Sequence, residues 1–542
     1  EIYNYKELKK KLENKGYNFR SRCDGEVICN LFKEYETEAF HHLEGMFAIT
    51  LWSTKTNTLY LARDFVGEKP LYYSKLKNNG LVFGSNIKSI NLFFKKKLDL
   101  NYQGIWDFPT FLWIPEPNTI FKNILCLPKA SFLKINTSKF EIKKYKIKNY
   151  FFNDMDSTEK KILSVKEIVE SSVQEKLLSD VPVGTFLSSG IDSSIITALA
   201  SRQIKNLETF SVGFEKIKDP FHGMADESRL ASEFAKFLGV KNYRIRLDEN
   251  NVLNSLDIFS DNSDGPFGVS SGIGVLLIAK KAKEQGIKVL LSGDGADEYF
   301  GGYSWYSFLN NVDFNDKSEN ETFFTLNNFF QNDSEVIAKL NKMSKDYLGY
   351  ALHYYAHEKE KRNIFNLEIF KDSKTSIRLF SNLKKLNISI DDYLDHDRDF
   401  YFTNEMLRKL DRMCMAFSIE SRIPFVSRKI RSFCKNSNFS DFFLNNNLKG
   451  ILRLAFKDLL PEKVLKRKKH GFNFPIDFWL KNSKKWHDLL HHSFSEESAL
   501  FKLNIIDKMS LINLRKMLNQ SKLNGHTFFC YIMLNKWLER SY

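Results

Sequence analysis

The sequence predicts two regions of different fold class: an α+β region with antiparallel strands, then a larger α/β region with a mostly parallel sheet. Up to about residue 135, short alternating runs are separated by turn residues. After residue 161, apolar strand-like runs alternate with amphipathic helical segments, which is typical of a parallel sheet covered by helices. A chain of 542 residues is too long for one core, so more than one domain is expected. We place the domains at 1–135 and 161–542, joined by a polar linker at 136–160.

Two hairpins are predicted in the first region. The segment 46–64 contains two alternating runs around "STKTN", and the segment 70–85 turns at "NNG". The stretch 136–160 has weak periodicity, which favours a linker over a regular element. The first region is therefore expected to be antiparallel and rich in strands.

The second region should begin with a helix at 160–178. The strands that we predict there alternate with helical segments, and they lie at 181–186, 208–214 and 287–293. Helices are expected to open at Asp192 and to cover 227–240. From about residue 310 onward, aromatic-rich helical segments dominate and few strand signals remain.

Composition excludes several classes of protein. No segment approaches the ~20 consecutive apolar residues of a membrane span, so no membrane partner is expected. The charged segment 1–19 indicates an amphipathic helix and lacks the features of a signal peptide. The six cysteines have no C-x-x-C spacing, which indicates neither a zinc site nor a disulfide framework. We expect a protein of the reducing cytoplasm.

The net charge of +15 raises the question of a nucleic-acid partner. Lysines are spread over the chain, and the densest basic run, 465–472, is short and ends in a Gly-Phe turn. No RNA-binding signature accompanies this run. A lysine-rich solvated surface is the favoured interpretation, and RNA binding stays as a minor alternative.

The turn "LSSGIDSS" at 187–194 has the chemistry of a phosphate site. Backbone N–H groups in a Ser/Gly turn at a helix N-terminus bind anions, and Gly190 permits close approach of a ligand. The hydroxyl groups that could donate to phosphate oxygens belong to Ser188, Ser193 and Ser194. Asp192 would repel phosphate unless a divalent cation lies between them, so the turn implies Mg²⁺. A capped helix without a ligand is the competing interpretation.

A second turn, 289–303, decides between these interpretations. It again leaves an apolar strand for a glycine-rich turn, which now carries Asp294, Asp297 and Glu298. In an open α/β sheet, ligands collect at the carboxyl ends of the strands, where both turns would lie. A hard cation prefers carboxylate and phosphate oxygens as ligands. The two turns together predict a site for a phosphate-bearing ligand with Mg²⁺.

The motifs of the second region resemble a known family. The turn at 187–194 is similar to the pyrophosphate loop of the ATP-pyrophosphatase superfamily. The segments that resemble successive motifs of the glutamine-hydrolysing asparagine synthetases are "TFSVGF", "DESRLASEFAKFLGV", "LLSGDGADEYFGGY", "DRMCMAFSIESRIPF" and "LLPEKVLKRKKHGFNFPIDFWL". Upstream, 45–73 and "SRCDGEV" resemble the class II glutaminase half of the same family. The resemblance covers nearly the whole chain in order.

This resemblance implies a fold and a reaction. The fold would be an ATP-pyrophosphatase-type synthetase domain preceded by a partial, N-terminal-nucleophile-type glutaminase domain. ATP would adenylate aspartate to β-aspartyl-AMP with release of pyrophosphate, and ammonia from glutamine would displace AMP. The partners are then ATP, aspartate, and glutamine or ammonia, with a homodimer as an open alternative to the monomer.

The resemblance also implies residue roles in the synthetase half. Leu187 and Val212 would contact the adenosine, Ser292 and Gly293 would contact the nucleotide by backbone, and Asp192 and Asp297 would hold Mg²⁺. The implied catalytic residues are Asp294, which influences formation of the acyl-adenylate, Lys469 and Arg422. Without the resemblance, Lys469 is one cation of a solvated face, and Arg422 is as well explained as a buried structural pair.

Three departures from the family pattern stand out. Ser189 replaces the first glycine of the pyrophosphate loop, and Asn86 occupies a position that is usually Glu. The segment "EIYNY" resembles the end of the family's "NGEIYNY", so the nucleophilic cysteine would precede Glu1. Of the glutamine site, only Glu1 and Asp24 remain. We expect either a fragment or a protein that uses free ammonia, and favour the fragment.

Other functions stay open at this point. Relatives with the same motifs amidate sugar acids or precursors of antibiotics and peptides, and one sequence does not distinguish an aspartate pocket from theirs. An RNA-modifying ATP pyrophosphatase is a rival of another class, favoured by the basic charge. A catalytically inactive scaffold is opposed by the intact acidic residues of both turns.

Overall fold

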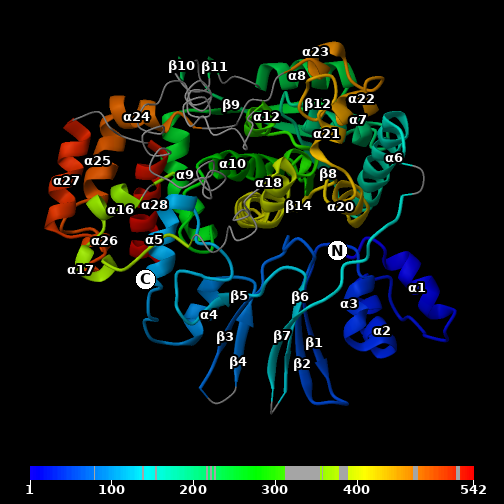
Figure 1. Cartoon of the computed structure of the whole chain (residues 1–542), viewed down its shortest axis with the longest axis horizontal. Coiled ribbons are helices and arrows are strands. Elements are labelled where there is room, and N and C mark those ends of the chain that lie inside the picture. The colour runs from blue at the N-terminus through cyan, green and yellow to red at the C-terminus, as the bar shows by residue number, and fades with distance from the viewer. Residues whose placement is uncertain are drawn as a thin grey trace.

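The computed structural model describes most of the chain in two layers (Figure 1). The described residues are 1–77, 80–136, 139–152, 155–214, 218–219, 223–224, 228–311, 355–356, 358–376, 389–467, 474–519 and 525–542. The N-terminal strands form the lower layer of Figure 1, and the parallel sheet with its helices forms the upper one. The N-terminus lies at the boundary between these layers.

The N-terminal region carries two antiparallel sheets, as predicted. One sheet has the order β1 (Ala48–Ser53), β2 (Thr58–Arg63), β6 (Ser131–Ile135) and β7 (Phe140–Lys144). In the other, β3 (Tyr72–Lys75) lies between β4 (Leu81–Gly84) and β5 (Leu125–Cys126). Both predicted hairpins are confirmed, because β1 pairs with β2 and β3 pairs with β4. The stretch 136–160, expected as a linker, contains β7, whose outer face is charged and exposed.

The helices of this region pack in different places around the sheets. They are α1 (Tyr5–Glu13), α2 (Gly25–Tyr35), the short 3₁₀ turn η1 (Glu36–Glu38), α3 (Ala39–His42), α4 (Ile87–Phe93) and α5 (Tyr102–Phe111). The amphipathic helix expected at the start of the chain is α1, which buries Leu8 and Leu12. Helix α5 packs against the C-terminal helix α28 (Gly525–Ser541). Residues of the predicted first domain therefore contribute to the core of the second region.

A five-stranded parallel sheet is the centre of the second region. Its order is β12 (Lys241–Leu247), β9 (Glu208–Phe214), β8 (Val183–Phe186), β13 (Val289–Leu291) and β14 (Glu420–Arg422). All four neighbouring pairs are parallel. The three strands predicted from the sequence are the three central ones. Both edge strands were missed, and β14 lies within the part expected to contain few strands.

Helices cover both faces of this sheet. Those that follow or precede its strands are α6 (Thr158–Leu177), α7 (Ile191–Ser201), α8 (Ser228–Leu238), α9 (Glu249–Asn262), α10 (Ser271–Glu284), α11 (Ala296–Phe300) and α12 (Ser304–Asn311). Two two-residue strands, β10 (Lys218–Asp219) and β11 (Gly223–Met224), pair with each other. The helices predicted at 160–178, from Asp192 and at 227–240 correspond to α6, α7 and α8.

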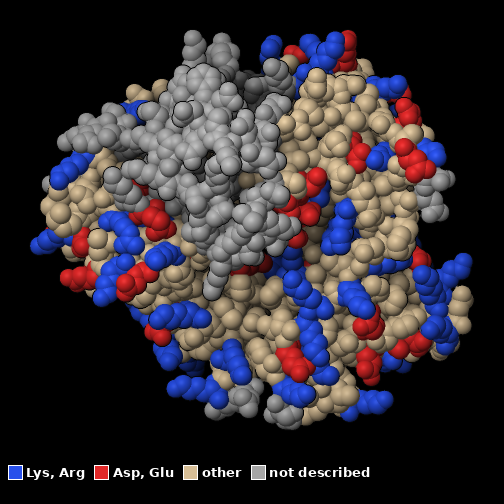
Figure 2. Space-filling view, in the orientation of Figure 1, with Lys and Arg blue, Asp and Glu red and all other residues tan. Residues whose placement is uncertain are grey.

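The remainder of the described chain is helical except for β14. The helices are α16 (Glu358–Ile364), α17 (Leu367–Phe370), α18 (Ile390–His396), the π-helical η4 (Asp397–Leu407), α19 (Arg408–Met415), α20 (Arg428–Lys435), α21 (Phe439–Phe442), α22 (Gly450–Ala455), α23 (Glu462–Leu465), α24 (Ile476–Asn482), α25 (Lys484–Ser493), α26 (Ala499–Lys502) and α27 (Lys508–Asn519). None of the helices described here is long and apolar enough to cross a lipid bilayer. On the face in Figure 2, Lys and Arg are scattered over both layers among acidic residues.

Candidate functional site

Both predicted turns meet in one cavity of about 490 Å³ in the second region. The turn after β8 and the turn after β13 are neighbours because these strands pair directly and run parallel. The carboxyl ends of adjacent parallel strands therefore bring together residues about a hundred positions apart in sequence. We call this cavity the nucleotide pocket.

Serine hydroxyls hold the first turn in shape. The Ser193 hydroxyl accepts from the backbone N–H of Ser188 at 3.0 Å, and the two hydroxyl oxygens lie 2.9 Å apart. Gly190 precedes α7 with an extended backbone, φ −75°, so its role is space and not a left-handed conformation. Ser194 donates its hydroxyl to the Gly190 carbonyl at 2.8 Å. The Ser189 hydroxyl is buried and has no hydrogen-bond partner among the described residues.

The second turn is pressed against the first. A Cβ added at Gly293 would lie 2.8 Å from the Ser193 backbone nitrogen, so only glycine fits at this contact. Gly295 has a left-handed backbone, φ +91°, which favours glycine at the start of α11. The Ser292 hydroxyl donates to the Asp294 carboxylate at 2.5 Å. The turn is therefore held by its glycines and by a hydroxyl that fixes one acid.

Behind the second turn lies a buried acid, Glu298. Tyr303 donates its hydroxyl to this carboxylate. Burial, followed by the neighbouring charge of Asp297, raises the pKa of Glu298 to about 8. Near neutral pH this side chain is therefore largely protonated, and it adds little negative charge behind the pocket.

Lys449 is a candidate site residue that sequence reasoning missed. Its ammonium lies 2.7 Å from both carboxylate oxygens of Asp192 and 2.8 Å from Oδ1 of Asp297. The side chain is 2% exposed, so this ion-pair cluster is largely screened from water. Gly302 provides the space, because a Cβ there would lie 2.6 Å from Cε of Lys449. In the sequence, this lysine precedes α22 in an ordinary polar segment with no cluster to mark it.

The two acids fit a divalent cation that arrives together with a nucleotide. Their carboxylates converge on one point, now taken by the Lys449 ammonium, and phosphate oxygens would complete the octahedral ligand set that Mg²⁺ prefers. In the part of the chain that the structure describes, no group of three or more His, Cys, Asp or Glu side chains forms an all-protein metal site. The donor chemistry is that of a metal shared with phosphate.

Most of the predicted site residues lie in the nucleotide pocket. Its lining includes Leu187, Ser188, Asp192, Ser193, Val212, Ser292, Gly293, Asp294 and Asp297. Gly190 and Ser194 stand in the same turn without lining the cavity. Lys469 lies outside the described residues.

Arg422 lies outside the lining of this pocket, in the arrangement of a buried structural pair. Its guanidinium is bound by Glu420 at 2.7 Å and by Glu1 at 2.8 Å. The resemblance implied a catalytic role for Arg422, which stays a prediction, but the structure does not place this side chain in the lining of the pocket. The physical reason is that β14 points this side chain toward the N-terminal region.

The far wall of the nucleotide pocket is aromatic. Tyr303 and Trp305 stack with ring centroids 4.1 Å apart, and Tyr401 meets Tyr303 edge to face at 5.8 Å. Tyr355 and His526 extend this wall. Glu405 and Lys409 supply charges on the same side of the pocket. The wall is suited to an apolar or ring-bearing group next to one with charge.

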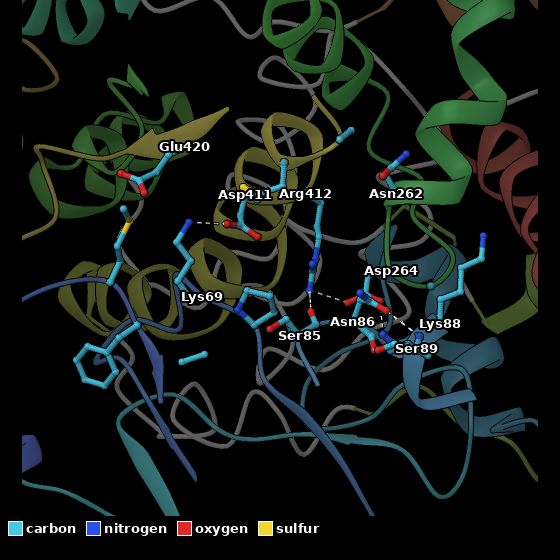
Figure 3. Close-up of a pocket in the computed structure, with 18 of the residues that line it drawn as sticks. Lys69, Ser85, Asn86, Lys88, Ser89, Asn262, Asp264, Asp411, Arg412 and Glu420 are labelled. Atoms are coloured by element: carbon cyan, nitrogen blue, oxygen red, sulfur yellow. Dashed lines mark hydrogen bonds and ion pairs between the residues drawn. The ribbon is translucent and has the colours of Figure 1, made fainter. Parts of the chain in front are cut away.

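A second cavity, of about 990 Å³, lies between the two regions (Figure 3). We call it the interdomain pocket. Glu1 and Asp24, the two residues predicted to bind glutamine, both line it. Across it, Lys69 contacts Asp411 at 2.7 Å. Arg412 contacts Asp264, also at 2.7 Å.

Asn86 also lines the interdomain pocket, and its side chain has a structural role there. Its side chain accepts from the Ser89 backbone N–H at 2.8 Å and so caps the N-terminus of α4. Asparagine is among the preferred N-cap residues. The departure from Glu at this position is therefore compatible with a stable helix.

Two family models match the chain. Residues 164–539 match asparagine synthase, and residues 1–146 match a glutamine amidotransferase domain. Asparagine synthetase [glutamine-hydrolyzing] 1 of Bacillus subtilis is 31% identical over 495 residues, covering 89% of this chain and 76% of the relative. Asparagine synthetase [glutamine-hydrolyzing] 3 of the same organism is 27% identical over 523 residues, covering 93% and 80%. Amidase chry2 of Gibberella zeae is 29% identical over 321 residues, 56% of this chain and 46% of the relative.

Solved structures give weaker matches. An NH3-dependent NAD synthetase from Campylobacter jejuni has a TM-score of 0.19 and 15% identity, covering 34% of this chain and 83% of that one. A glutamine-dependent NAD+ synthetase from Acinetobacter baumannii has a TM-score of 0.19 and 12% identity, covering 55% and 72%. These scores are too low to assign a fold by comparison. The family models match both regions in order, and this chain belongs to the asparagine synthase family, with a glutamine amidotransferase domain at its N-terminal end.

Proposed function

We propose that this chain uses ATP to adenylate the side-chain carboxylate of aspartate and then transfers ammonia to it, giving asparagine. The observation that carries this proposal is the meeting of two acid-bearing glycine turns at the ends of neighbouring strands, joined by one buried ammonium. Membership in the family supports glutamine-dependent amidation of a carboxylate. The N-terminal-nucleophile and ATP-pyrophosphatase fold types belong to the same proposal.

In the first step, negative charge develops on phosphate groups, and the pocket would neutralise it. A carboxylate oxygen of the acceptor attacks the α-phosphorus of ATP, and the bond to the β-phosphate oxygen breaks with release of pyrophosphate. Serine hydroxyls and backbone N–H groups of the first turn would bind the departing phosphates. Asp192 and Asp297 would hold Mg²⁺, which supplies positive charge to the phosphates when bound. Lys449 would then be freed to contact phosphate oxygens itself.

In the second step, the lone pair of ammonia attacks the acyl carbon, AMP leaves, and one proton passes to solvent. Adenylation is required because a free carboxylate has no good leaving group. Asp294, held by Ser292, would act at the acyl-adenylate. Leu187 and Val212 would contact the adenosine, and Lys469 would neutralise charge that develops on the phosphoryl oxygens. Glu1 and Asp24 would bind glutamine in the interdomain pocket.

A larger acceptor is the second candidate, because the far wall is aromatic. Aromatic rings such as those of Tyr303 and Trp305 provide a surface on which a sugar or aryl group can pack. The short side chain of aspartate does not require such a surface. This arrangement favours a carboxylate attached to a ring. It keeps the adenylation chemistry unchanged.

ATP–pyrophosphate exchange tests the proposal. The purified chain is given Mg²⁺, ATP and labelled pyrophosphate with aspartate, glucuronate or an aryl carboxylate, and with RNA as a separate arm. Exchange that depends on aspartate, followed by asparagine formation from ammonium, is the expected result. Exchange only with the ring-bearing acids would select the second candidate. Exchange only with RNA, or none at all, would refute carboxylate adenylation by this chain.

A further inference from the structure

Arg422 is bound by groups from three separate segments of the chain. Its Nε donates to Glu420 on the same strand, and one terminal nitrogen donates to Glu1 at 2.8 Å. The other terminal nitrogen donates to the backbone carbonyls of Lys176 at 2.9 Å and Leu178 at 2.7 Å. The Arg422 side chain is 2% exposed, whereas the carboxylates of Glu1 and Glu420 are 35% and 33% exposed. A planar guanidinium with all three nitrogens engaged has its position fixed by its partners.

One of these partners belongs to the N-terminal region. Glu1 lines the interdomain pocket, and its carboxylate bonds to a guanidinium that belongs to the parallel sheet. The N-terminus lies at the boundary of the two layers in Figure 1, close to the level of β14. The contact therefore joins the predicted glutamine site to the sheet that carries the nucleotide pocket.

The backbone of Arg422 continues this connection to the nucleotide pocket. Strand β14 pairs with β13, and Leu291 lies opposite Arg422. The next backbone N–H, of Ser292, donates to the Arg422 carbonyl at 2.8 Å. Ser292 in turn fixes the Asp294 carboxylate through its hydroxyl. A continuous series of bonds thus runs from Glu1 through Arg422 to Asp294.

The same guanidinium also holds the segment that leads into β8. Leu178 directly follows α6, and the chain enters β8 at Val183. The carbonyls of Lys176 and Leu178 would otherwise be unpaired groups at a helix C-terminus. Arg422 therefore bonds to the end of α6 as well as to Glu1 of the other region.

We propose that Arg422 is a positioning residue that connects Glu1 in the interdomain pocket to the Ser292–Asp294 turn, so that ATP-dependent turnover depends on the Glu1 carboxylate. The inference rests on the proposed function. Ammonium-supported turnover needs no glutamine, so Glu1 has no direct role in it. An effect of Glu1 on that reaction must pass through the series of bonds described above. Such coupling between sites is commonly worth roughly 5- to 150-fold.

The experiment uses the 542-residue chain with ammonium chloride as nitrogen source. Pyrophosphate release is measured for Glu1→Gln, with the carboxylate that supports exchange in the wild type. Turnover is expressed per ATP-binding site, counted by calorimetry, because a partly unfolded sample lowers the number of sites and not the turnover per site. Glu1→Gln should lower turnover per site about five- to tenfold, within the range typical of coupled sites. The ATP dissociation constant should change less than about twofold, because Glu1 acts on the turn and not on the nucleotide.

Asp261→Asn is the matched control. Asp261 lines the same pocket and bonds to Arg540 at 2.9 Å rather than to Arg422. This variant should keep ammonium-supported turnover within about twofold of the wild type, the scale of additivity error for uncoupled sites. Equal losses in Asp261→Asn and Glu1→Gln would indicate a general disturbance of the pocket and would overturn the proposal.

Arg422→Lys completes the cycle. Lysine keeps the positive charge, but it lacks the planar guanidinium that bonds to Glu1 and to the carbonyls of Lys176 and Leu178 at the same time. Turnover in the double variant with Glu1→Gln should equal that of Arg422→Lys alone, because residues in one series are not additive. Independent, multiplying losses would refute the connection, as would wild-type turnover in Glu1→Gln. Glu1 is 35% exposed, so its variant remains informative even if Arg422→Lys does not fold. Absence of exchange in the wild type would instead refute the proposed function.

Discussion

The two cavities of this protein neutralise their acidic residues in different ways. In the nucleotide pocket, two acids from turns of the same sheet share the ammonium of Lys449. In the interdomain pocket, Asp411 of the second region pairs with Lys69 of the N-terminal region, 342 positions away in sequence. A site built at the ends of adjacent strands is visible in short motifs. A site built between two regions depends on how those regions dock.

Substitution of Lys449 should have the largest effect, because it removes the cation that two acids of the nucleotide pocket share. Lys449→Met leaves Asp192 and Asp297 close together without their cation. Removing one partner of a buried ion pair costs about 3–5 kcal/mol, so thermal stability should fall and exchange should drop by more than about a hundredfold. Differential scanning calorimetry and the exchange assay measure both. Exposed Lys457, changed to Met, should alter neither.

The effect of Mg²⁺ on the melting temperature gives a second test of the same site. The acids freed in Lys449→Met can bind a divalent cation, so Mg²⁺ should raise the melting temperature of the variant more than that of the wild type. An identical Mg²⁺ response in both proteins would contradict our assignment of Asp192 and Asp297 as metal ligands.

Lys469 tests a predicted residue that lies outside the described part of the chain. If its ammonium meets charge that grows only in the transition state, Lys469→Ala should lower kcat and kcat/KM together, by about a hundredfold. Lys468→Ala should cost at most about 1 kcal/mol if this neighbour has no role in the reaction. Steady-state kinetics on both variants distinguish them. A larger loss in Lys468→Ala would mean that the motif is shifted by one residue.

The buried acid behind the nucleotide pocket predicts a pH dependence of stability. The pKa of Glu298 is raised from 4.5 to about 8, so the folded state holds a proton that the unfolded state has released. Stability from this group is fully present below pH 4.5 and is lost as pH rises to about 8, at no more than about 1.4 kcal/mol per pH unit. Glu298→Gln should flatten this decline. Melting curves from pH 5 to 8 should show no such change in Glu284→Gln, whose side chain is exposed.

Substitution of Lys69 is expected to have the smallest effect and tests the interdomain side. Lys69→Met removes the partner of Asp411, whose side chain is 5% exposed. The expected loss is about 2 kcal/mol of stability, below the buried-pair range because Lys69 is itself 19% exposed. Lys11 and Glu7 form an exposed pair, so Lys11→Met should cost less than about 0.5 kcal/mol. Equal losses in both variants, measured by urea unfolding, would remove the distinction between the two kinds of pair.

The sequence predicted the centre of the parallel sheet better than its edges. Strands β8, β9 and β13 are mostly buried, so their sequences carry a clear apolar signal. Strand β12 has the pattern "KNYRIRL" with several exposed positions, and β14 is three residues long and reads "ESR". Strand β7 carries exposed charges and was expected to be linker. Edge strands face solvent on one side, which removes the hydrophobic signal.

By itself, the sequence determined the family to which the chain belongs and the two acid-bearing turns, which contribute Asp192 and Asp297 to the nucleotide pocket. These features are local, because a strand, its turn and the following helix are consecutive in the chain. Only the tertiary structure added the aromatic lining, placed Lys449 between Asp192 and Asp297 and bound Arg422 to Glu1. A buried charge is positioned by partners that are distant in sequence, and its burial requires them. No local pattern names those partners, so they are decided by packing within the second region for Lys449 and between the two regions for Arg422.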